Sequence, residues 1–108
     1  MKTIITTAAI LAAITTAAHA EAYTYMCKVG PKSYSVTVTT PNDDMEGGTI
    51  TWRGTVFQDV KLGEGCRYNF VATKDGITAE LCTATKGYAD LTIGRARFYC
   101  QMNNARVR

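Results

Sequence analysis

Four cysteines constrain this chain of 108 residues more than any other feature of its sequence. They are Cys27, Cys66, Cys82 and Cys100. An even number of cysteines in a short exported chain is typical of a disulfide framework. No two of them have the C-x-x-C spacing on which thioredoxin-like redox pairs and zinc ribbons depend. The sequence therefore predicts two structural disulfides, no metal site and no cofactor.

Turn signals rank the three pairings that four cysteines allow. Residues 74–76, Lys-Asp-Gly, form a hairpin signal between two extended stretches. Folding the chain about this turn places Cys66 within about a residue of lying opposite Cys82, which favours a bond between them. The other bond, Cys27 to Cys100, would tie the first strand to the last. Closing loops of these sizes stabilises a fold by roughly 3 and 4 kcal/mol.

The start of the chain has the organisation of a secretory signal. Lys2 precedes an apolar run, 4–18, that is rich in alanine and threonine and too short to span a bilayer. The first and last residues of the Ala-His-Ala triplet, 18–20, are small and match the two positions that a signal peptidase reads. Because of this triplet we expect cleavage after Ala20. The cleavage would separate the signal peptide, 1–20, from a single domain, 21–108. The product would be periplasmic or secreted, with no membrane anchor.

The charge of the chain does not favour nucleic acid as a partner. The formal net charge of +3 falls to +2 when Lys2 is removed with the signal. Two small basic groups remain, Arg95 with Arg97 and Arg106 with Arg108. The first alternates along an expected strand and the second ends the chain. Binding through counterion release needs a larger contiguous cationic surface.

Alternation of apolar and polar residues predicts an all-β fold. Tyr34, Val36 and Val38 alternate with serines and threonines, as in a half-buried strand. Similar stretches recur between turn signals along the rest of the chain. This rhythm predicts a small antiparallel barrel or sandwich of about seven short strands. The expected strands are 23–29, 33–39, 49–53, 56–62, 68–72, 77–81 and 91–102.

Residues 77–88 are open to two interpretations. Several apolar residues of this segment are spaced for one face of a helix. Its β-branched threonines, such as Thr78 and Thr83, favour a strand instead. The expected bond at Cys82 also suits an extended hairpin better than a helix. We therefore prefer a strand.

The residues available for catalysis are few. The only histidine, His19, lies in the expected signal, so Ser-His and Cys-His catalysis are excluded from the rest of the chain. Paired carboxylates, Asp43 with Asp44 or Asp59 with Glu64, remain as the option for a glycosidase-like hydrolase. The first pair lies in a turn rich in glycine, proline and asparagine, which suits a solvated loop. We expect that the protein is not an enzyme.

A rigid sheet held by disulfides can present aromatic and cationic side chains to a partner. Trp52 shares a strand face with Ile50, so we expect it in the core, with its neighbour Arg53 pointing outward. Other cations and tyrosines fall in turns or on the outer side of the last strand. The candidate binding residues are Arg53, Lys86, Tyr88, Arg97 and Tyr99.

The ends of the domain resemble a known family. The run Tyr-Met-Cys at 25–27, Gly30, the run Tyr-Ser-Val-Thr-Val at 34–38 and the closing Cys100 are similar to the bacterial C-type lysozyme inhibitors, which are exported single-domain β-barrels. The inhibitory loop of that family carries Ser-Gly-x-x-Tyr and then a Trp-x-Lys-Gly-like segment, whereas this chain has only Lys-Gly-Tyr at 86–88 and a displaced Trp-Arg-Gly. The resemblance implies a lysozyme-like partner, whose acidic catalytic groups would pair with a lysine such as Lys86.

These features together suggest an exported binding protein, with inhibition of a lysozyme-like enzyme as its specific form. In general form the chain also resembles other four-cysteine exported proteins of Gram-negative bacteria. The alternatives are an envelope-associated structural domain without a dedicated ligand and a carboxylate hydrolase. The hydrolase would require two acids about 5 to 9 Å apart in one cleft.

Overall fold

The computed structural model describes residues 20–102, which form nine strands in one antiparallel sheet. A single 3-10 turn joins the seventh strand to the eighth. Nearly all of the expected signal peptide, together with Arg106 and Arg108, lies outside the described residues. The elements are β1 (Glu21–Val29), β2 (Lys32–Thr40), β3 (Thr49–Trp52), β4 (Thr55–Gln58), β5 (Lys61–Gly63), β6 (Tyr68–Lys74), β7 (Ile77–Thr83), η1 (Thr85–Gly87), β8 (Tyr88–Ile93) and β9 (Ala96–Met102).

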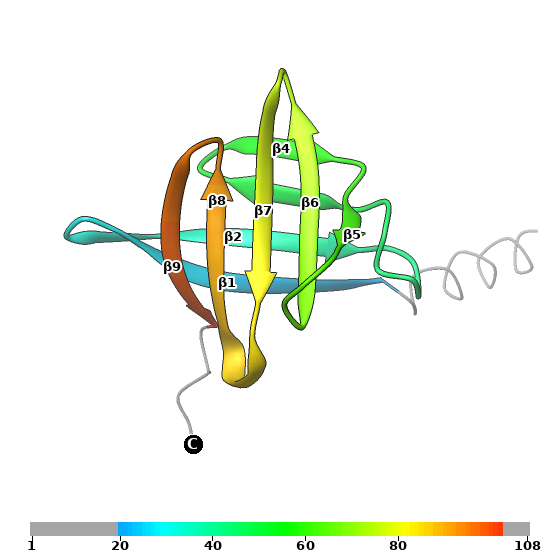
Figure 1. Cartoon of the computed structure of the whole chain (residues 1–108), viewed down its shortest axis with the longest axis horizontal. Helices are drawn as coiled ribbons and strands as arrows, with labels where there is room; N and C mark the ends of the chain where they lie inside the picture. The colour runs from blue at the N-terminus through cyan, green and yellow to red at the C-terminus, as the bar shows by residue number, and fades with distance from the viewer. Residues whose placement is uncertain (1–19, 103–108) are drawn as a thin grey trace, which may run out of the picture.

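The strands follow the order β4-β3-β2-β1-β9-β8-β7-β6-β5 across the sheet. Every neighbouring pair is consecutive in the chain except β1 with β9. The sheet curls so that β6 to β9 lie across β1 to β4, with β6 in contact with both β3 and β4 (Figure 1). The fold is thus a half-barrel. It is all-β and antiparallel as expected, but it has more strands than the expected seven. Within residues 20–102 no helix is long and apolar enough to cross a membrane.

Two of the expected strands are each interrupted by a turn. Asp59 has a positive φ of 58°, which bends the chain between β4 and β5. The bend switches the inward-facing side from odd-numbered to even-numbered residues. Phe57 before it and Val60 after it are both buried, while Val56 is exposed. The second interruption is Gly94, with a φ of 62°, at the turn between β8 and β9. An aspartate with a positive φ leaves only a weak signal in a sequence, so the alternation predicts residues 56–62 as one strand.

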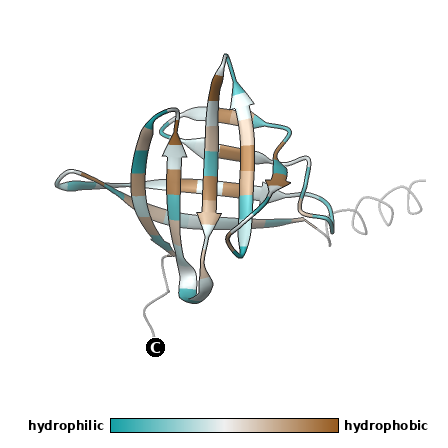
Figure 2. Cartoon of the chain, viewed as in Figure 1, coloured by the Kyte–Doolittle hydropathy of each residue, from teal (hydrophilic) through white to brown (hydrophobic). Residues whose placement is uncertain are grey.

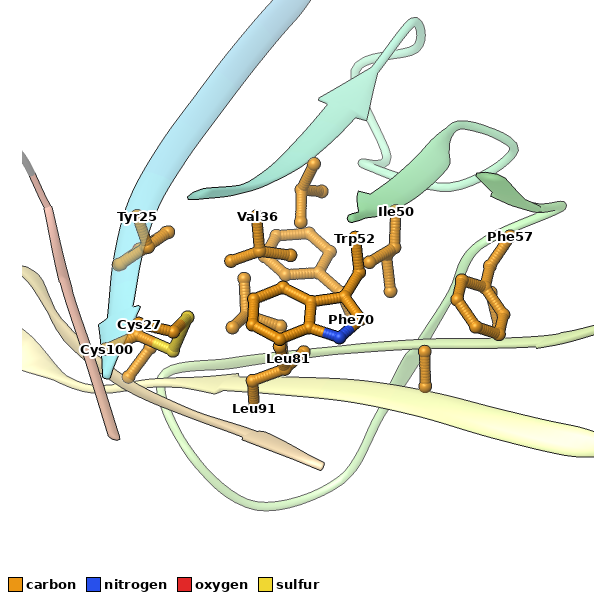
Figure 3. Packing of buried hydrophobic residues seen from close by; sticks show 14 of the residues in the cluster. Tyr25, Cys27, Val36, Ile50, Trp52, Phe57, Phe70, Leu81, Leu91 and Cys100 are labelled. Atoms are coloured by element: carbon orange, nitrogen blue, oxygen red, sulfur yellow. A yellow bond between two sulfur atoms is a disulfide. The ribbon is translucent and has the colours of Figure 1, made fainter. Parts of the chain in front are cut away.

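The concave face of the sheet is apolar. Hydrophobic and hydrophilic residues alternate along most strands (Figure 2). The buried cluster is Tyr25, Cys27, Val36, Val38, Ile50, Trp52, Phe57, Val60, Phe70, Ala72, Ala79, Leu81, Ala89, Leu91 and Cys100. Trp52 is in this core as expected, among side chains from both layers (Figure 3). Its indole ring is 5.2 Å from the Phe98 ring, centroid to centroid, which joins β3 to β9.

The first expected disulfide closes the two ends of the domain. Cys27 and Cys100 are bonded and lie directly opposite each other on β1 and β9. Both side chains are fully buried. Only three residue pairs join β1 to β9, so the covalent bond reinforces a short contact between strands that are distant in the chain.

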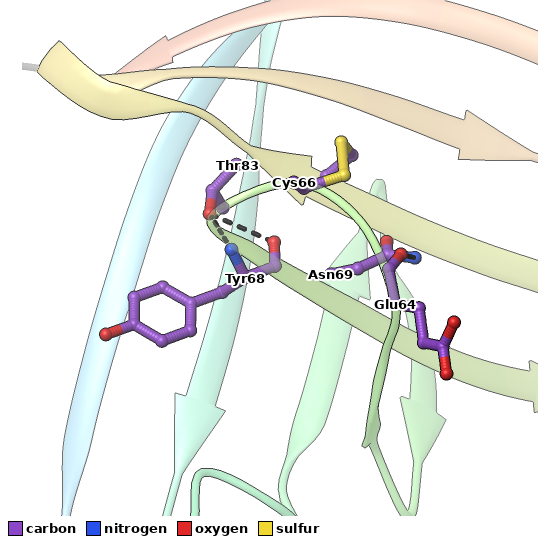
Figure 4. The surroundings of a disulfide bond; sticks show 6 residues. Glu64, Cys66, Tyr68, Asn69 and Thr83 are labelled. Atoms are coloured by element: carbon purple, nitrogen blue, oxygen red, sulfur yellow. Dashed lines mark hydrogen bonds between the residues drawn. A yellow bond between two sulfur atoms is a disulfide. The ribbon is translucent and has the colours of Figure 1, made fainter.

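The second expected disulfide, Cys66 to Cys82, is also present, but the chain reaches it differently. The β6–β7 register places Asn69, not residue 66, opposite Cys82. Cys66 instead has a φ of 60°, and the next residue, Arg67, donates its N–H to the carbonyl of Thr83 at 2.8 Å. The expected register was therefore wrong although the pairing is confirmed. The chain curves as it enters β6, and this curve brings Cys66 to Cys82 although the two are not opposite each other in the register (Figure 4).

Gly48 provides a test of the packing between the β2–β3 connection and the rest of the fold. A Cβ added there would lie 1.8 Å from the carbonyl oxygen of Thr39, and the Gly48 carbonyl also accepts the N–H of Val60 at 3.1 Å. Because backbone must move to make room, we expect Gly48→Ala to lower the free energy of unfolding by about 3 kcal/mol. Gly54→Ala has a positive φ but open space, and should cost about 1 kcal/mol. Urea denaturation measures both, and equal losses would contradict the steric reason.

Candidate binding site

Arg53 is exposed as expected, but its side chain contacts Tyr34 of the same domain. It lies in the β3–β4 turn with a φ of 48°. Its guanidinium carbon is 4.0 Å from the ring centroid of Tyr34, a cation–π contact. The β3–β4 turn and η1 lie at different ends of the half-barrel (Figure 1). The structure therefore does not bring Arg53 together with the candidate residue in η1, Lys86.

Three other candidates share the outer face of β8 and β9. The rings of Tyr88 and Tyr99 stack, with centroids 6.0 Å apart and planes at 26°. Both rings remain in water, because Tyr88 is 37% and Tyr99 is 51% exposed. Arg97 is exposed two residues before Tyr99 on β9, so the period of the strand places it on the same face.

Lys86 lies beside this face at the tip of η1. Its backbone has a φ of 66°, and the Ala84 N–H donates to the Tyr88 carbonyl at 2.7 Å, which closes the loop. Lys86 is exposed and two residues from Tyr88. The strand interpretation of residues 77–83 is confirmed, and helical structure between 77 and 88 is limited to the three residues of η1.

A hollow of about 400 Å³ opens next to η1, and most of its residues were not singled out from the sequence. It lies between β1, β6 and the β7–β8 loop. Its lining residues are Tyr23, Tyr25, Met45, Arg67, Tyr68, Phe70, Thr83, Ala84, Thr85, Lys86, Gly87 and Met102. The signal that was available is the i, i+2 spacing of aromatic residues at the ends of two strands, at 23 and 25 on β1 and at 68 and 70 on β6.

The hollow has a buried inner end and a polar rim. Tyr25 and Phe70 are 5% and 2% exposed and belong to the core. Tyr68 is half-exposed at the rim, with the guanidinium carbon of Arg67 5.8 Å from its ring centroid. The Thr83 hydroxyl accepts the Tyr68 N–H and donates to the Tyr68 carbonyl, each at 3.0 Å (Figure 4). These bonds hold the rim of β6 firmly against β7.

Two tyrosine hydroxyls in the hollow have raised pKa values. The Tyr23 hydroxyl donates to a carboxylate oxygen of Glu21, and this hydrogen bond, with burial as the second cause, raises the pKa of Tyr23 to about 12. Burial raises the pKa of Tyr25. Both phenols are therefore neutral near pH 7 and contribute no negative charge to the hollow.

The raised pKa of Tyr23 makes stability depend on pH in the alkaline range. The folded chain binds this proton more tightly than the unfolded chain, so the contribution to stability is complete below pH 10.0 and is lost as the pH rises towards about 12. We expect Tyr23→Phe to have a flatter decline in urea midpoint across that window than the original protein. Tyr25 is unchanged in both proteins and provides the background. An identical slope in the two proteins would contradict the bond to Glu21.

The acidic residues considered for catalysis take part in the turns of the fold. A carboxylate oxygen of Asp44 accepts the N–H of Glu46 at 3.0 Å, which forms a turn between β2 and β3. Asp59 occupies the bend between β4 and β5, and Glu64 accepts the side-chain amide of Asn69 through its backbone carbonyl. No group of three or more metal-binding side chains occurs within residues 20–102.

Comparison with known proteins found no matching family model, no matching curated protein and no matching solved structure. Within residues 20–102, the surface features with the chemistry of a binding site are the exposed tyrosine pair, Lys86 and the aromatic hollow.

Proposed function

We propose that this protein is an exported binding protein that attaches to an acidic protein partner through η1 and the outer face of β8 and β9. The supporting observation is the stacked pair Tyr88–Tyr99, which leaves two large rings in water beside an exposed lysine. Tyrosine is enriched at the centres of protein interfaces because it buries a large area with few rotatable bonds.

Charge on this surface favours an acidic partner. Lys86 is at the tip of η1, and Arg97 lies along the same face as Tyr99. Neither forms an ion pair with another residue in the described part of the chain, 20–102, and the one acidic side chain of β8, the exposed Asp90, lies opposite Tyr99 on the same face. Complementary charge increases the rate and the specificity of association. The resemblance to lysozyme inhibitors makes the acidic cleft of a lysozyme the first partner to test.

The test is inhibition and direct binding with the disulfide-bonded protein produced from the full chain. We expect it to bind a lysozyme and to slow its lysis of cell walls. Lys86→Ala and Tyr88→Ala should each weaken binding at least tenfold, about 1.4 kcal/mol, as central interface residues do. Arg53→Ala is the matched control, because this cation contacts Tyr34 instead and should leave binding unchanged.

Three outcomes would count against the proposal. If the original protein neither binds nor inhibits a lysozyme, the lysozyme form is wrong. If the protein also captures nothing from periplasmic extract, an envelope-associated structural role is favoured over a binding function. An equal loss of binding in the Arg53 and Lys86 variants would move the interface away from η1.

A further inference from the structure

We propose that the hollow between β1, β6 and the β7–β8 loop binds a small organic anion with an aromatic body, of the aryl carboxylate class. Its volume of about 400 Å³ falls within the range of small-molecule sites. Tyr88 and Tyr99 do not line it, so this site is separate from the proposed protein-binding face and shares only Lys86 with it. It adds a ligand of low molecular weight to the proposed function.

The aromatic body is favoured by the walls. Tyr25 and Phe70 close the inner end, and both side chains belong to the buried core. Tyr23 and Tyr68 add two more rings nearer the mouth. Aromatic rings pack against one another through offset and edge-to-face contacts that a saturated chain cannot make. Met45 and Met102 complete the wall, and their flexible thioethers adapt to the outline of a ligand.

The anionic group is favoured by two cations at the rim. Arg67 comes from the loop before β6, and Lys86 comes from η1. Both are exposed, and within the described chain, 20–102, neither has a carboxylate partner. The planar guanidinium of Arg67 matches a carboxylate through two parallel hydrogen bonds. The nearby carboxylate of Glu21 is engaged by the Tyr23 hydroxyl and does not line the hollow.

The loops that carry these cations are tied to the sheet before any ligand arrives. The residue before Arg67 is bonded covalently to Cys82, and the Arg67 N–H donates to the Thr83 carbonyl at 2.8 Å. On the other side, the Ala84 N–H donates to the carbonyl of Tyr88 at 2.7 Å, at the base of η1. Loops that are already ordered lose less conformational entropy on binding. The hollow is therefore suited to a small ligand with few contacts to offer.

A competing occupant would be the end of this chain. Residues 103–108, Asn-Asn-Ala-Arg-Val-Arg, follow directly after Met102, which lines the hollow. They bring two arginines and no acidic side chain. Placing these beside Arg67 and Lys86 would oppose like charges, whereas an anion would neutralise them. Charge complementarity therefore favours the anion over the tail.

Calorimetric titration with matched naphthalene probes tests the site. We expect naphthalene-2-carboxylate to bind the disulfide-bonded protein with one site, and naphthalene-2-methanol to bind at least tenfold more weakly. Arg67→Gln should lower the affinity for the carboxylate towards that for the alcohol, with Lys86 retaining part of the preference. The affinity for the alcohol should be unchanged, because the variant removes only one of the two cations. Tyr68→Ala should weaken both probes. Tyr99→Ala, on the other face, is the control and should weaken neither.

Several results would overturn this site. They are the absence of carboxylate binding at about 1 mM, which is weak for a small ligand, equal affinity for the two probes, and an Arg67→Gln variant that binds like the original protein. A chain ending at Met102 that binds the carboxylate more than tenfold better than the full chain would show that the tail is the occupant. Thermal unfolding of each variant separates a lost contact from a lost fold. Because Tyr88→Ala tests only the protein-binding face, failure of either proposal is distinguishable from failure of the other.

Discussion

Replacing Cys27 and Cys100 together by alanine is expected to lower the free energy of unfolding by about 4 kcal/mol. The two cysteines are 73 residues apart, so the bond closes a large loop in the unfolded chain and lowers the conformational entropy of the unfolded state. It also reinforces a β1–β9 contact of only three residue pairs, in which both cysteines are fully buried. A small domain has a total stability of about 5 to 15 kcal/mol, so the double variant should lose a large part of its stability and unfold at a clearly lower temperature than the original protein.

The second disulfide is the matched control. Replacing Cys66 and Cys82 by alanine should cost about 3 kcal/mol, because these residues are only 16 apart and β6 and β7 remain paired as a hairpin without the bond. Urea denaturation under oxidising conditions gives both values. A larger loss from the Cys66 pair than from the Cys27 pair would contradict the assignment of β1–β9 closure as the weaker contact.

Trp52→Ala is the second change with a large expected effect, a loss of about 4 kcal/mol. Trp52 is 7% exposed, and its ring contacts Tyr34 at 6.3 Å and Phe98 at 5.2 Å between centroids. Because these partners come from β2 and β9, the indole fills the space between the two layers of the curled sheet. Its removal leaves a cavity that the surrounding strands can close only by moving.

Two further variants distinguish loss of this core packing from the mere removal of an aromatic ring. Trp52→Phe should retain most of the packing and cost about 1.5 kcal/mol. Tyr99→Ala removes a ring that is 51% exposed, and should change stability by no more than about 0.5 kcal/mol. Thermal unfolding measures all three, and near-ultraviolet circular dichroism reports whether the remaining core is still ordered. Similar losses at Trp52 and Tyr99 would contradict the central position of the indole.

The candidate residues show how far sequence reasoning reaches into function. Tyr88 was selected because it lies outside a clear alternation, and Tyr99 because alternation places it on the outer side of the last strand; the structure stacks their two rings on one face. Arg53 was also selected by alternation, but its cation–π contact with Tyr34 is made through the fold and leaves no trace in the sequence. Exposure can be read from alternation, whereas the neighbours of an exposed side chain cannot.

The hollow illustrates the same limit more strongly. Tyr25 and Phe70 close its inner end although 45 positions separate them in the chain. Each looks like an ordinary inward-facing residue of its own strand. Arg67 looks like a loop residue, and its place at the rim depends on the left-handed turn at Cys66 and the curved approach to β6. A site built from separate strands appears only when the sheet has curled.

The sequence by itself determined the all-β class and the burial of Trp52, and it ranked the observed pairing of the four cysteines first. These depend on period-two alternation and on turn residues, which act over a few neighbouring positions. Only the tertiary structure decided the count of nine strands, the register at Cys82 and the aromatic hollow. They depend on positive φ at Asp59 and Cys66 and on packing across the two layers. The free energy of such contacts is shared among residues far apart in the chain, so no local pattern of amino acids records it.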